Sequence, residues 1–411
     1  MLLDQAAVIF GIILKVASLY MLVMCLFFIK KAKPKKAFSP NQKFACLIAA
    51  RNEEAVIGNL IKSLKCQDYP SELIEIYAIP NNCTDNTADA ARRAGAEVIR
   101  PKGNIRNKGD ALHYAIRQLL PRRDIDCFII FDADNIAAPD FIKAMNDAFM
   151  NGAQITKSRI EAKNPYDSWV SGCYGLYYNI FNKFFNESRS RLGLAPKLIG
   201  TGMGIRRDVL LELGGWNTLT IAEDTEFNAD CVLDHYRIRW VPDAVTYDEA
   251  PESFRTSLKQ RKRWVAGIME VAHERLSDLM FEMRKGYNLH QLIDMSMLLI
   301  LPYLQVFSLI PGLMLIISGI LSGSFKWVLL TLSVSFAASY LGTAAFALLL
   351  AKLSPYNTSS MRNAILLFPV FTLSWIPICI GAFFTGAGWE PIRHTHSISF
   401  NELDYMKESA A

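Results

Sequence analysis

The chain has 411 residues, of which 51% are hydrophobic, and its 44 basic and 39 acidic residues give a net charge of +5. This apolar content, with a mean hydropathy of +0.17, excludes an ordinary water-soluble enzyme. Much of the charge excess comes from a lysine-rich run at residues 30–36, which suits anionic lipid headgroups, so we expect no nucleic-acid partner. The eight cysteines show no C-x-x-C pair, which fits reduced thiols and neither a zinc site nor a disulfide framework.

Four long and nearly uncharged segments approach the roughly 20 residues that cross a bilayer, namely 6–29, 303–322, 327–351 and 363–385. The first is too long for the apolar region of a secretory signal, so we interpret it as a retained anchor. The positive-inside tendency places the lysines after it in the cytoplasm. We therefore expect a multi-pass protein of the cell membrane, with an anchor at 1–36, a cytoplasmic domain at 37–287, spans at 288–386 and a tail at 387–411.

Between the first two apolar segments, strands and helices alternate. The pattern predicts strands at 44–49, 74–79, 97–99 and 127–131, and helices at 54–65, 87–94 and 109–119. Such alternation predicts an α/β fold with a mostly parallel, right-handed, Rossmann-like sheet. In sheets of this kind, ligands collect at the carboxyl ends of the strands.

Two more helices are expected after this sheet. Residues 169–187 carry aromatic residues at helical spacing, which is typical either of a helix in the membrane interface or of one packed on the sheet. Both alternatives stay open at this point. Residues 255–280 form another long helical stretch.

Asp132 and Asp134 come directly after the strand at 127–131. Residues two apart at the end of a strand can direct both carboxylates to one point, and carboxylate oxygens suit Mg²⁺ or Mn²⁺. A cation held there would neutralise a departing diphosphate. The alternative is that the two acids are ordinary turn or cap residues.

Glu223 and Asp224 open a helix after a glycine-rich turn. Transfer to a sugar carbon needs a base that takes the proton from the incoming hydroxyl, and Asp224 is the candidate. The alternative is a pair of N-terminal helix acids, which the helix dipole favours.

Gln260, Arg263 and Trp264 lie on neighbouring positions of the helix at 255–280. Arginine offers a planar donor fork that suits phosphate, and tryptophan offers a flat face for a sugar ring. The alternative is a basic helix on anionic lipid, a role in which Arg261 and Lys262 would serve.

With these three clusters in this order, the chain resembles the processive, membrane-embedded family 2 glycosyltransferases, which include cellulose, hyaluronan, chitin and poly-N-acetylglucosamine synthases. The resemblance covers residues 43–266 and the flanking anchors. It implies a GT-A fold, a metal at Asp132-Ala133-Asp134, and Asp224 of Ala222-Glu223-Asp224 as the general base. It also implies that Arg263 contacts the diphosphate and that Gln260 and Trp264 contact the acceptor.

The same resemblance implies roles for further segments. The nucleotide sugar would meet Ala50, Arg51, Glu53, Asn81, Asp85, Lys108 and Asp132, and the acceptor would rest on Gly200, Thr201 and Gly202. In the tail, a gating contact with the nucleotide would involve Arg393, His394 and Thr395. Two positions depart from the family pattern: Asn81 stands where an aspartate is usual, and Ala222 where a threonine is usual.

The implied function is a processive inverting β-glycosyltransferase that polymerises a UDP-hexose into a linear extracellular polysaccharide and extrudes it. Gly200-Thr201-Gly202 looks more like the Gly-Ser-Gly of glucan synthases, which favours UDP-glucose slightly, with UDP-N-acetylglucosamine next. The expected partners are the UDP-sugar, the growing polysaccharide, the lipid bilayer and, potentially, accessory export subunits.

Two rival interpretations stay open. One is a non-processive enzyme that adds a single sugar to a lipid, and the other is a catalytically silent scaffold or sugar-binding subunit. The tail poses a further question, because three spans after a cytoplasmic domain would leave it outside. It stays inside if Pro369 and Pro377 make the last segment kinked or re-entrant, or if 292–322 holds more than one helix.

Overall fold

A mixed sheet of eight strands forms the centre of the computed structural model, which describes residues 2–29, 36–385 and 402. The strand order is β3-β2-β1-β4-β7-β6-β8-β5. Their bounds are β1 (Phe44–Ala50), β2 (Ile74–Pro80), β3 (Glu97–Val98), β4 (Cys127–Asp132), β5 (Ile136–Ala137), β6 (Ile155–Ala162), β7 (Met203–Arg206) and β8 (Ile238–Asp248).

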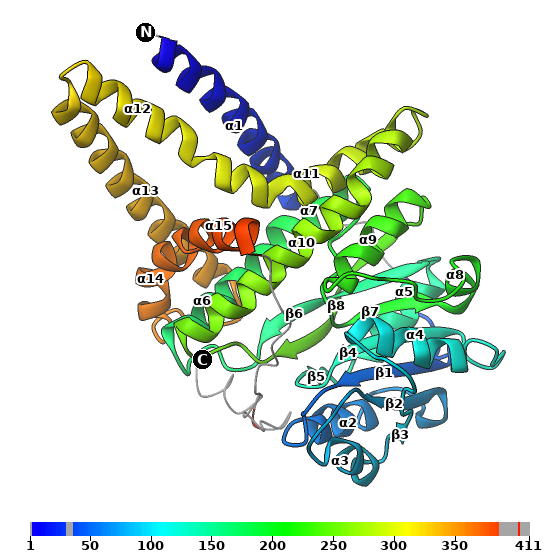
Figure 1. Ribbon diagram of the computed structural model, residues 1–411. Coiled ribbons are helices and arrows are strands. Elements are labelled where there is room, and N and C mark those ends of the chain that lie inside the picture. Colours follow the sequence, from blue (N-terminus) through cyan, green and yellow to red (C-terminus); the bar gives the residue numbers. More distant parts are fainter. Residues whose placement is uncertain (1, 30–35, 386–401, 403–411) are drawn as a thin grey trace.

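The first half of the sheet matches the prediction. Strands β3, β2, β1 and β4 are all parallel, and successive residues of β1 point to opposite faces. Phe44, Cys46 and Ile48 pack against α2 (Ile57–Lys65), α3 (Thr87–Ala94) and α5 (Phe141–Met150). Ala45 and Leu47 pack against α4 (Lys108–Leu119), α8 (Arg207–Glu212) and α9 (Glu223–Leu233). Helices therefore cover both faces of the sheet (Figure 1).

The second half is not mostly parallel, which corrects the expectation. Strand β7 runs antiparallel to both β4 and β6, and β5 runs antiparallel to β8, while β6 and β8 are parallel. Strand β7 begins at the edge where β4 ends, so it can only run back along β4. Strand β6 was not predicted because its buried positions Thr156, Lys157 and Ser158 are polar and hide the apolar pattern.

The aromatic-rich residues 169–187 belong to helices that pack against the rest of the protein. They form α6 (Trp169–Asn179) and a π-helical stretch at Ile180–Glu187, which α7 (Ser188–Leu192) follows. Helix α6 lies between β6 and α14 (Arg362–Leu373), so closely that a Cβ on Gly172 would come within 2.6 Å of the Ala364 Cβ. This arrangement agrees with the alternative of a helix packed on the sheet.

The long helix α10 (Phe254–Met283) separates the sheet from the remaining helices (Figure 1). In the described part of the chain, four helical segments are long and apolar enough to cross a membrane: Gln5–Ile29, Leu289–Leu321, Phe325–Leu353 and Arg362–Thr385. They comprise α1 (Leu2–Leu26) with a short 3₁₀ turn after it, α11 (Leu289–Phe307) with α12 (Leu309–Leu321), α13 (Phe325–Leu353), and α14 with α15 (Trp375–Thr385).

Two of these segments each consist of two consecutive helices rather than one. Segment 289–321 changes helix at Ser308, and segment 362–385 changes helix at Ser374. Helix α15 packs along α10, where Lys262 Nζ donates to Thr385 Oγ1 at 2.7 Å. Thr385, the last described residue of this segment, therefore lies beside α10. The candidate gating residues Arg393, His394 and Thr395 lie outside the described residues.

Candidate active site

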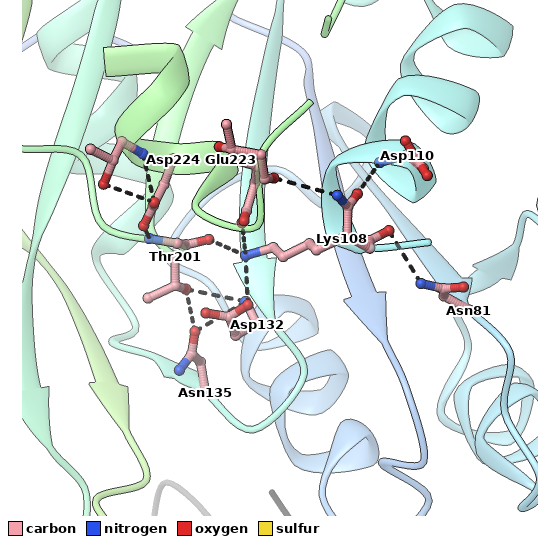
Figure 2. A network of polar contacts seen from close by, with 12 residues as sticks. Asn81, Lys108, Asp110, Asp132, Asn135, Thr201, Glu223 and Asp224 are labelled. Atoms are coloured by element: carbon pink, nitrogen blue, oxygen red, sulfur yellow. Dashed lines mark hydrogen bonds and ion pairs between the residues drawn. The ribbon is translucent and has the colours of Figure 1, made fainter. Parts of the chain in front are cut away.

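The candidate site lies at the edge of the sheet where β1, β2 and β4 end (Figure 2). Asp132 is the last residue of β4, and Gly200 and Thr201 lie in the loop that enters β7. Lys108 begins α4, and Glu223 and Asp224 begin α9. The fold thus brings these four segments of the chain to one place.

Lys108 is the centre of this cluster. Its Nζ lies 2.6 Å from Asp132 Oδ1 and 3.3 Å from Glu223 Oε1, and it also donates to the Gly200 carbonyl. Burial acts to lower the pKa of Lys108, but the carboxylates of Asp132 and Glu223 outweigh it and raise this pKa above its usual range. Lys108 therefore carries a permanent charge between the two acids.

The candidate acceptor residues Gly200, Thr201 and Gly202 form a loop, here called the acceptor loop. Gly200 links this loop to the candidate base, Asp224. Its backbone N–H donates to Asp224 Oδ2 at 2.6 Å. A Cβ at this position would lie 3.1 Å from Asp132 Oδ2 and 3.3 Å from Lys108 Nζ. Any larger residue at 200 would crowd Asp132 and Lys108, so glycine suits this position.

The two acids that open α9 differ in environment. Asp224 accepts hydrogen bonds at both oxygens, from Gly200 N and from the Thr225 amide at 2.6 Å. Glu223 is buried, and this burial raises its pKa to about 7 even though Lys108 acts in the opposite direction. Glu226 holds the loop that leads into these two acids, because its carboxylate accepts the amides of Leu219 and Thr220.

The hydrogen bonds around Thr201 involve three residues that the sequence did not predict as site residues: Asn135, Lys157 and Asp248. The Thr201 hydroxyl donates to Asn135 Oδ1, and Asn135 Nδ2 donates to Asp248 Oδ1 at 2.8 Å. Lys157 is fully buried in β6 and donates to the Thr201 carbonyl. Burial lowers the pKa of Lys157 to about 7, although Asp224 and Asp132 act to raise it. The only sequence signal for Lys157 is a lone lysine in a polar strand.

The predicted nucleotide loops lie at the ends of β1 and β2. The Ala50 carbonyl accepts the Asn81 amide at 2.8 Å, which holds the two loops together. Asn81 Nδ2 donates to the Asn107 carbonyl beside Lys108, and the buried Asn81 Oδ1 has no hydrogen-bond partner among the described residues. Asn81 therefore keeps a free acceptor at the site.

Asp85 instead supports the loops. Its carboxylate accepts the Glu54 and Thr87 amides, both at 3.1 Å. Burial acts to raise the pKa of Asp85, but these bonds and the Thr87 hydroxyl hold the pKa below its usual value. The Glu53 amide also donates to Thr87, at 2.9 Å, and Arg51 follows directly on β1. These contacts fix the backbone around the candidate nucleotide site.

The acidic turn after β4 fits a divalent cation. The Asp132 side chain is 37% exposed, and Asp134 is buried in the same turn, with its carbonyl accepting Lys163 Nζ at 3.0 Å. Among the described residues, no group of three or more His, Cys, Asp or Glu side chains could hold a metal. Two carboxylates in one turn suit Mg²⁺ or Mn²⁺, which take further ligands from substrate phosphates.

Gln260 and Trp264 lie on the face of α10 that meets α6. The Tyr174 hydroxyl donates to Gln260 Oε1 at 2.9 Å, and the Tyr174 ring meets the Trp264 ring edge-on with centroids 6.1 Å apart. Tyr174 was seen in the sequence only as part of the aromatic pattern. Sequence alone could not pair it with α10.

Arg263 lies on a face of α10 that approaches α9. One turn later, a Cβ on Gly267 would lie 2.7 Å from the Ala222 Cβ, and Glu270 Oε2 accepts the Ile221 amide at 3.2 Å. Positions 263, 267 and 270 share one side of a helix, so Arg263 is on the side of the Glu223–Asp224 turn. Its guanidinium makes no hydrogen bond or ion pair with any described residue and can accept an anionic ligand.

Arg261 does not face lipid headgroups, which corrects the alternative interpretation of this helix. It is completely buried, donates to the Phe371 carbonyl at 3.0 Å, and lies over the Phe371 ring. Lys262 binds Thr385, as described above. Both residues hold the C-terminal helices against α10.

A Rossmann-like mixed sheet with an acidic turn after β4 and a lysine–carboxylate cluster at its edge defines a glycosyltransferase of the GT-A fold. The chain belongs to the glycosyl transferase family group 2, whose model matches residues 127–385. The match starts at β4 and runs through α15, so it includes the apolar helices.

Two of the curated relatives that resemble this chain differ in their named product. The chain is 28% identical over 276 residues to a beta-monoglucosyldiacylglycerol synthase of Nostoc sp., covering 66% of this chain and 57% of that protein. It is 27% identical over 234 residues to the poly-beta-1,6-N-acetyl-D-glucosamine synthase of Staphylococcus epidermidis, covering 55% and 54%. The chain thus spans a little over half the length of these relatives.

A solved structure shares the fold over nearly the whole chain. The mannosyltransferase from Pyrobaculum calidifontis, in complex with GDP-Man and Mn²⁺, superimposes with a TM-score of 0.61 at 19% identity. The superposition covers 91% of this chain and 99% of that one, so the arrangement of sheet and helices recurs as a unit.

Proposed function

We propose that this chain transfers a hexosyl group from a UDP-sugar to an acceptor hydroxyl, with inversion at the anomeric carbon. The observation that carries the proposal is the convergence of Asp224, Lys108 and Asp132 on Gly200. In the proposal, the Asp224 carboxylate acts as the base beside a cationic and acidic edge suited to a diphosphate.

In the proposed step, Asp224 takes the proton of the acceptor hydroxyl. The hydroxyl oxygen forms a bond to the anomeric carbon as the bond from that carbon to the diphosphate oxygen breaks, and the nucleoside diphosphate leaves with the electron pair. Gly200 N–H and Thr225 N–H keep the Asp224 carboxylate oriented. Arg263 stabilises the charge that develops on the diphosphate, so most of the catalysis is electrostatic and positional.

A divalent cation, Mg²⁺ or Mn²⁺, bound by Asp132 and Asp134 would supply further charge stabilisation to the leaving diphosphate. Asn81, Ala50, Arg51, Glu53 and Asp85 form the proposed nucleotide side. Support for a metal and a nucleotide-sugar donor comes from the two acids of the turn at the end of β4 and from the GDP-Man and Mn²⁺ in the Pyrobaculum mannosyltransferase.

For the product, we propose a linear polysaccharide extruded across the membrane, made from UDP-glucose or, next, UDP-N-acetylglucosamine. Gln260 and Trp264 form the proposed acceptor side with Gly200, Thr201 and Gly202. Residues 37–287 would be the cytoplasmic catalytic domain, 1–36 the anchor and 288–386 the membrane region. The likeness to a poly-N-acetylglucosamine synthase supports this product.

A specific observation favours a second candidate, the transfer of one sugar to a lipid. Between 0% and 39% of the residues in the four apolar windows are buried within the chain, so most of these apolar side chains are open to contact with lipid. The likeness to a monoglucosyldiacylglycerol synthase covers more of the chain than the likeness to the polymer synthase. A lipid acceptor could reach the site laterally from the bilayer.

Product length separates the two candidates. Membranes that contain the full chain are incubated with each radiolabelled UDP-sugar, and with GDP-mannose as a donor control, in the presence of Mn²⁺. Label in an insoluble, hydrolase-sensitive chain supports the polysaccharide, whereas label that moves as a single-sugar lipid supports the second candidate. Transfer from none of the donors by wild type overturns the proposed reaction.

A further inference from the structure

A cleft of about 390 Å³ opens on the side of the sheet opposite the candidate active site. It lies where β6 and β8 begin, between the end of α7 and the start of α11. Because β6 and β4 both run antiparallel to β7, β6 begins at the edge where β4 begins. Asp132 ends β4, so this cleft is separate from the proposed catalytic residues.

The cleft is cationic and lacks a counter-charge. Arg237, Arg239 and His290 are among its lining residues, which include no Asp or Glu. Within the described residues, the Arg237 side chain makes no hydrogen bond or ion pair, and Arg239 donates only to the Asn151 carbonyl, at 3.1 Å. Neither guanidinium is therefore neutralised by a carboxylate.

Arg237 directly precedes β8 and Arg239 is the second residue of β8, and both line the cleft. Like charges that share a cleft repel each other unless an anion lies between them. A guanidinium presents a planar fork of donors that matches the oxygens of a phosphate group. The cleft therefore has the chemistry of a phosphate site.

Contacts of α11 with α1 and α7 show where the cleft lies relative to the apolar segments. Asp294, one turn after His290, accepts the Tyr20 hydroxyl at 2.9 Å, and Tyr20 is in the apolar segment Gln5–Ile29. The same Asp294 pairs with the buried Arg189 of α7 at 2.8 Å. These contacts fix the start of α11 beside Tyr20, inside the apolar segment that ends at Ile29.

Exposed apolar side chains flank the cleft. Tyr287 is 62% exposed and Leu289 is 43% exposed, at the corner between α10 and α11. A cationic cleft next to exposed apolar groups, at the start of a membrane-crossing segment, is suited to the boundary between lipid headgroups and acyl chains.

We propose that this cleft binds the phosphate of an anionic phospholipid through Arg237 and Arg239. The inference rests on the membrane placement proposed above, and it does not depend on the transfer reaction. The bound headgroup would hold the corner between α10 and α11 at the membrane surface.

The test measures lipid binding without a donor sugar. The full chain in neutral detergent is titrated with phosphatidylglycerol or phosphatidylcholine, and bound lipid is counted by native mass spectrometry. We expect wild type to retain phosphatidylglycerol and not phosphatidylcholine. The R237Q/R239Q variant should bind phosphatidylglycerol about tenfold more weakly, as expected for the loss of charge-assisted hydrogen bonds.

A matched control removes two exposed cations from the neighbouring turn, in the variant R284Q/K285Q. It should bind phosphatidylglycerol like wild type. Equal binding by wild type and R237Q/R239Q, or an equal loss in both double variants, overturns the proposal. Displacement of phosphatidylglycerol by the same concentration of inorganic phosphate also overturns it, because the ligand would then be a soluble anion.

Folding is controlled separately. Arg237 is exposed and its side chain has no described partner, so the single variant R237Q should keep the wild-type unfolding temperature and still bind phosphatidylglycerol more weakly. A chain that binds phosphatidylglycerol but transfers no sugar would support this inference and overturn only the proposed function.

Discussion

The backbone amide of Gly200 donates a hydrogen bond of 2.6 Å to Oδ2 of Asp224. This bond joins the loop proposed to carry the acceptor to the carboxylate proposed to accept its proton. The two groups are therefore held in register by the backbone, and a change of side chain at 224 can remove the base without moving the loop.

Asp224→Asn should reduce transfer by about 10²–10⁴-fold, the usual contribution of a general base. UDP binding should persist, because the asparagine oxygen can still accept from Gly200. UDP release gives the rate, and calorimetry gives UDP binding. Asp234→Asn, at an exposed position at the end of the same helix, is the control and should behave as wild type. Near-normal product from Asp224→Asn would rule out its role as the base.

Removal of divalent cations should abolish transfer, since the proposed cation sits at Asp132 and Asp134. Mn²⁺ or Mg²⁺ added back after EDTA should restore it, and Asp132→Asn should need more metal or fail to respond. Binding of Mn²⁺ in the presence of UDP, followed by electron paramagnetic resonance, gives a readout independent of turnover. Asp140→Asn, an exposed acid nearby, serves as the control. Full activity in excess EDTA would contradict the metal assignment.

Asn81→Ala should raise KM for the UDP-sugar about tenfold while kcat changes little, because the lost hydrogen bond serves donor binding before and during reaction. Asn81→Asp keeps the free acceptor but loses the donor to the Asn107 carbonyl, so its KM should be intermediate. Asn104→Ala, at an exposed position in the adjacent loop, should leave KM unchanged. An unchanged KM in Asn81→Ala would remove this residue from the nucleotide site.

Gly267→Ala should impair both stability and transfer. The new Cβ would lie 2.7 Å from the Ala222 Cβ, so α10 must move away from the turn that carries Glu223 and Asp224. Overpacking of this kind costs about 1–3 kcal/mol of unfolding free energy, and a displacement of about 1 Å can cost roughly 10²-fold in rate. Thermal unfolding and UDP release measure the two effects.

Two variants check the steric explanation for Gly267. Gly312→Ala places the same methyl group in a helix where nothing lies within 4 Å, so it should be neutral in both measurements. Ala222→Gly in the Gly267→Ala background removes the contacting Cβ and should recover part of the lost rate. Failure to recover any rate would mean that the 267–222 contact does not position the site.

The sequence predicted individual segments well where their pattern is local. The helix at 87–94 has the same bounds in the structure, and the strand at 44–49 is longer by one residue. Strand β6 was missed because polar side chains such as Lys157 occupy its buried positions, and β8 was missed because Pro242 and Asp243 interrupt its apolar run. Hydrophobic periodicity cannot reveal a strand whose buried side chains line or support a polar site.

The order of the apolar segments, the acidic turn after β4 and the acids that open α9 were determined by the sequence itself, because chain composition and spacing are local properties. Only the tertiary structure decided that Lys108 bridges Asp132 and Glu223, that Asn135 connects Thr201 to Asp248, and that Arg261 is buried. These contacts join residues far apart in the chain, so they depend on strand order and on helix packing. No local pattern encodes them.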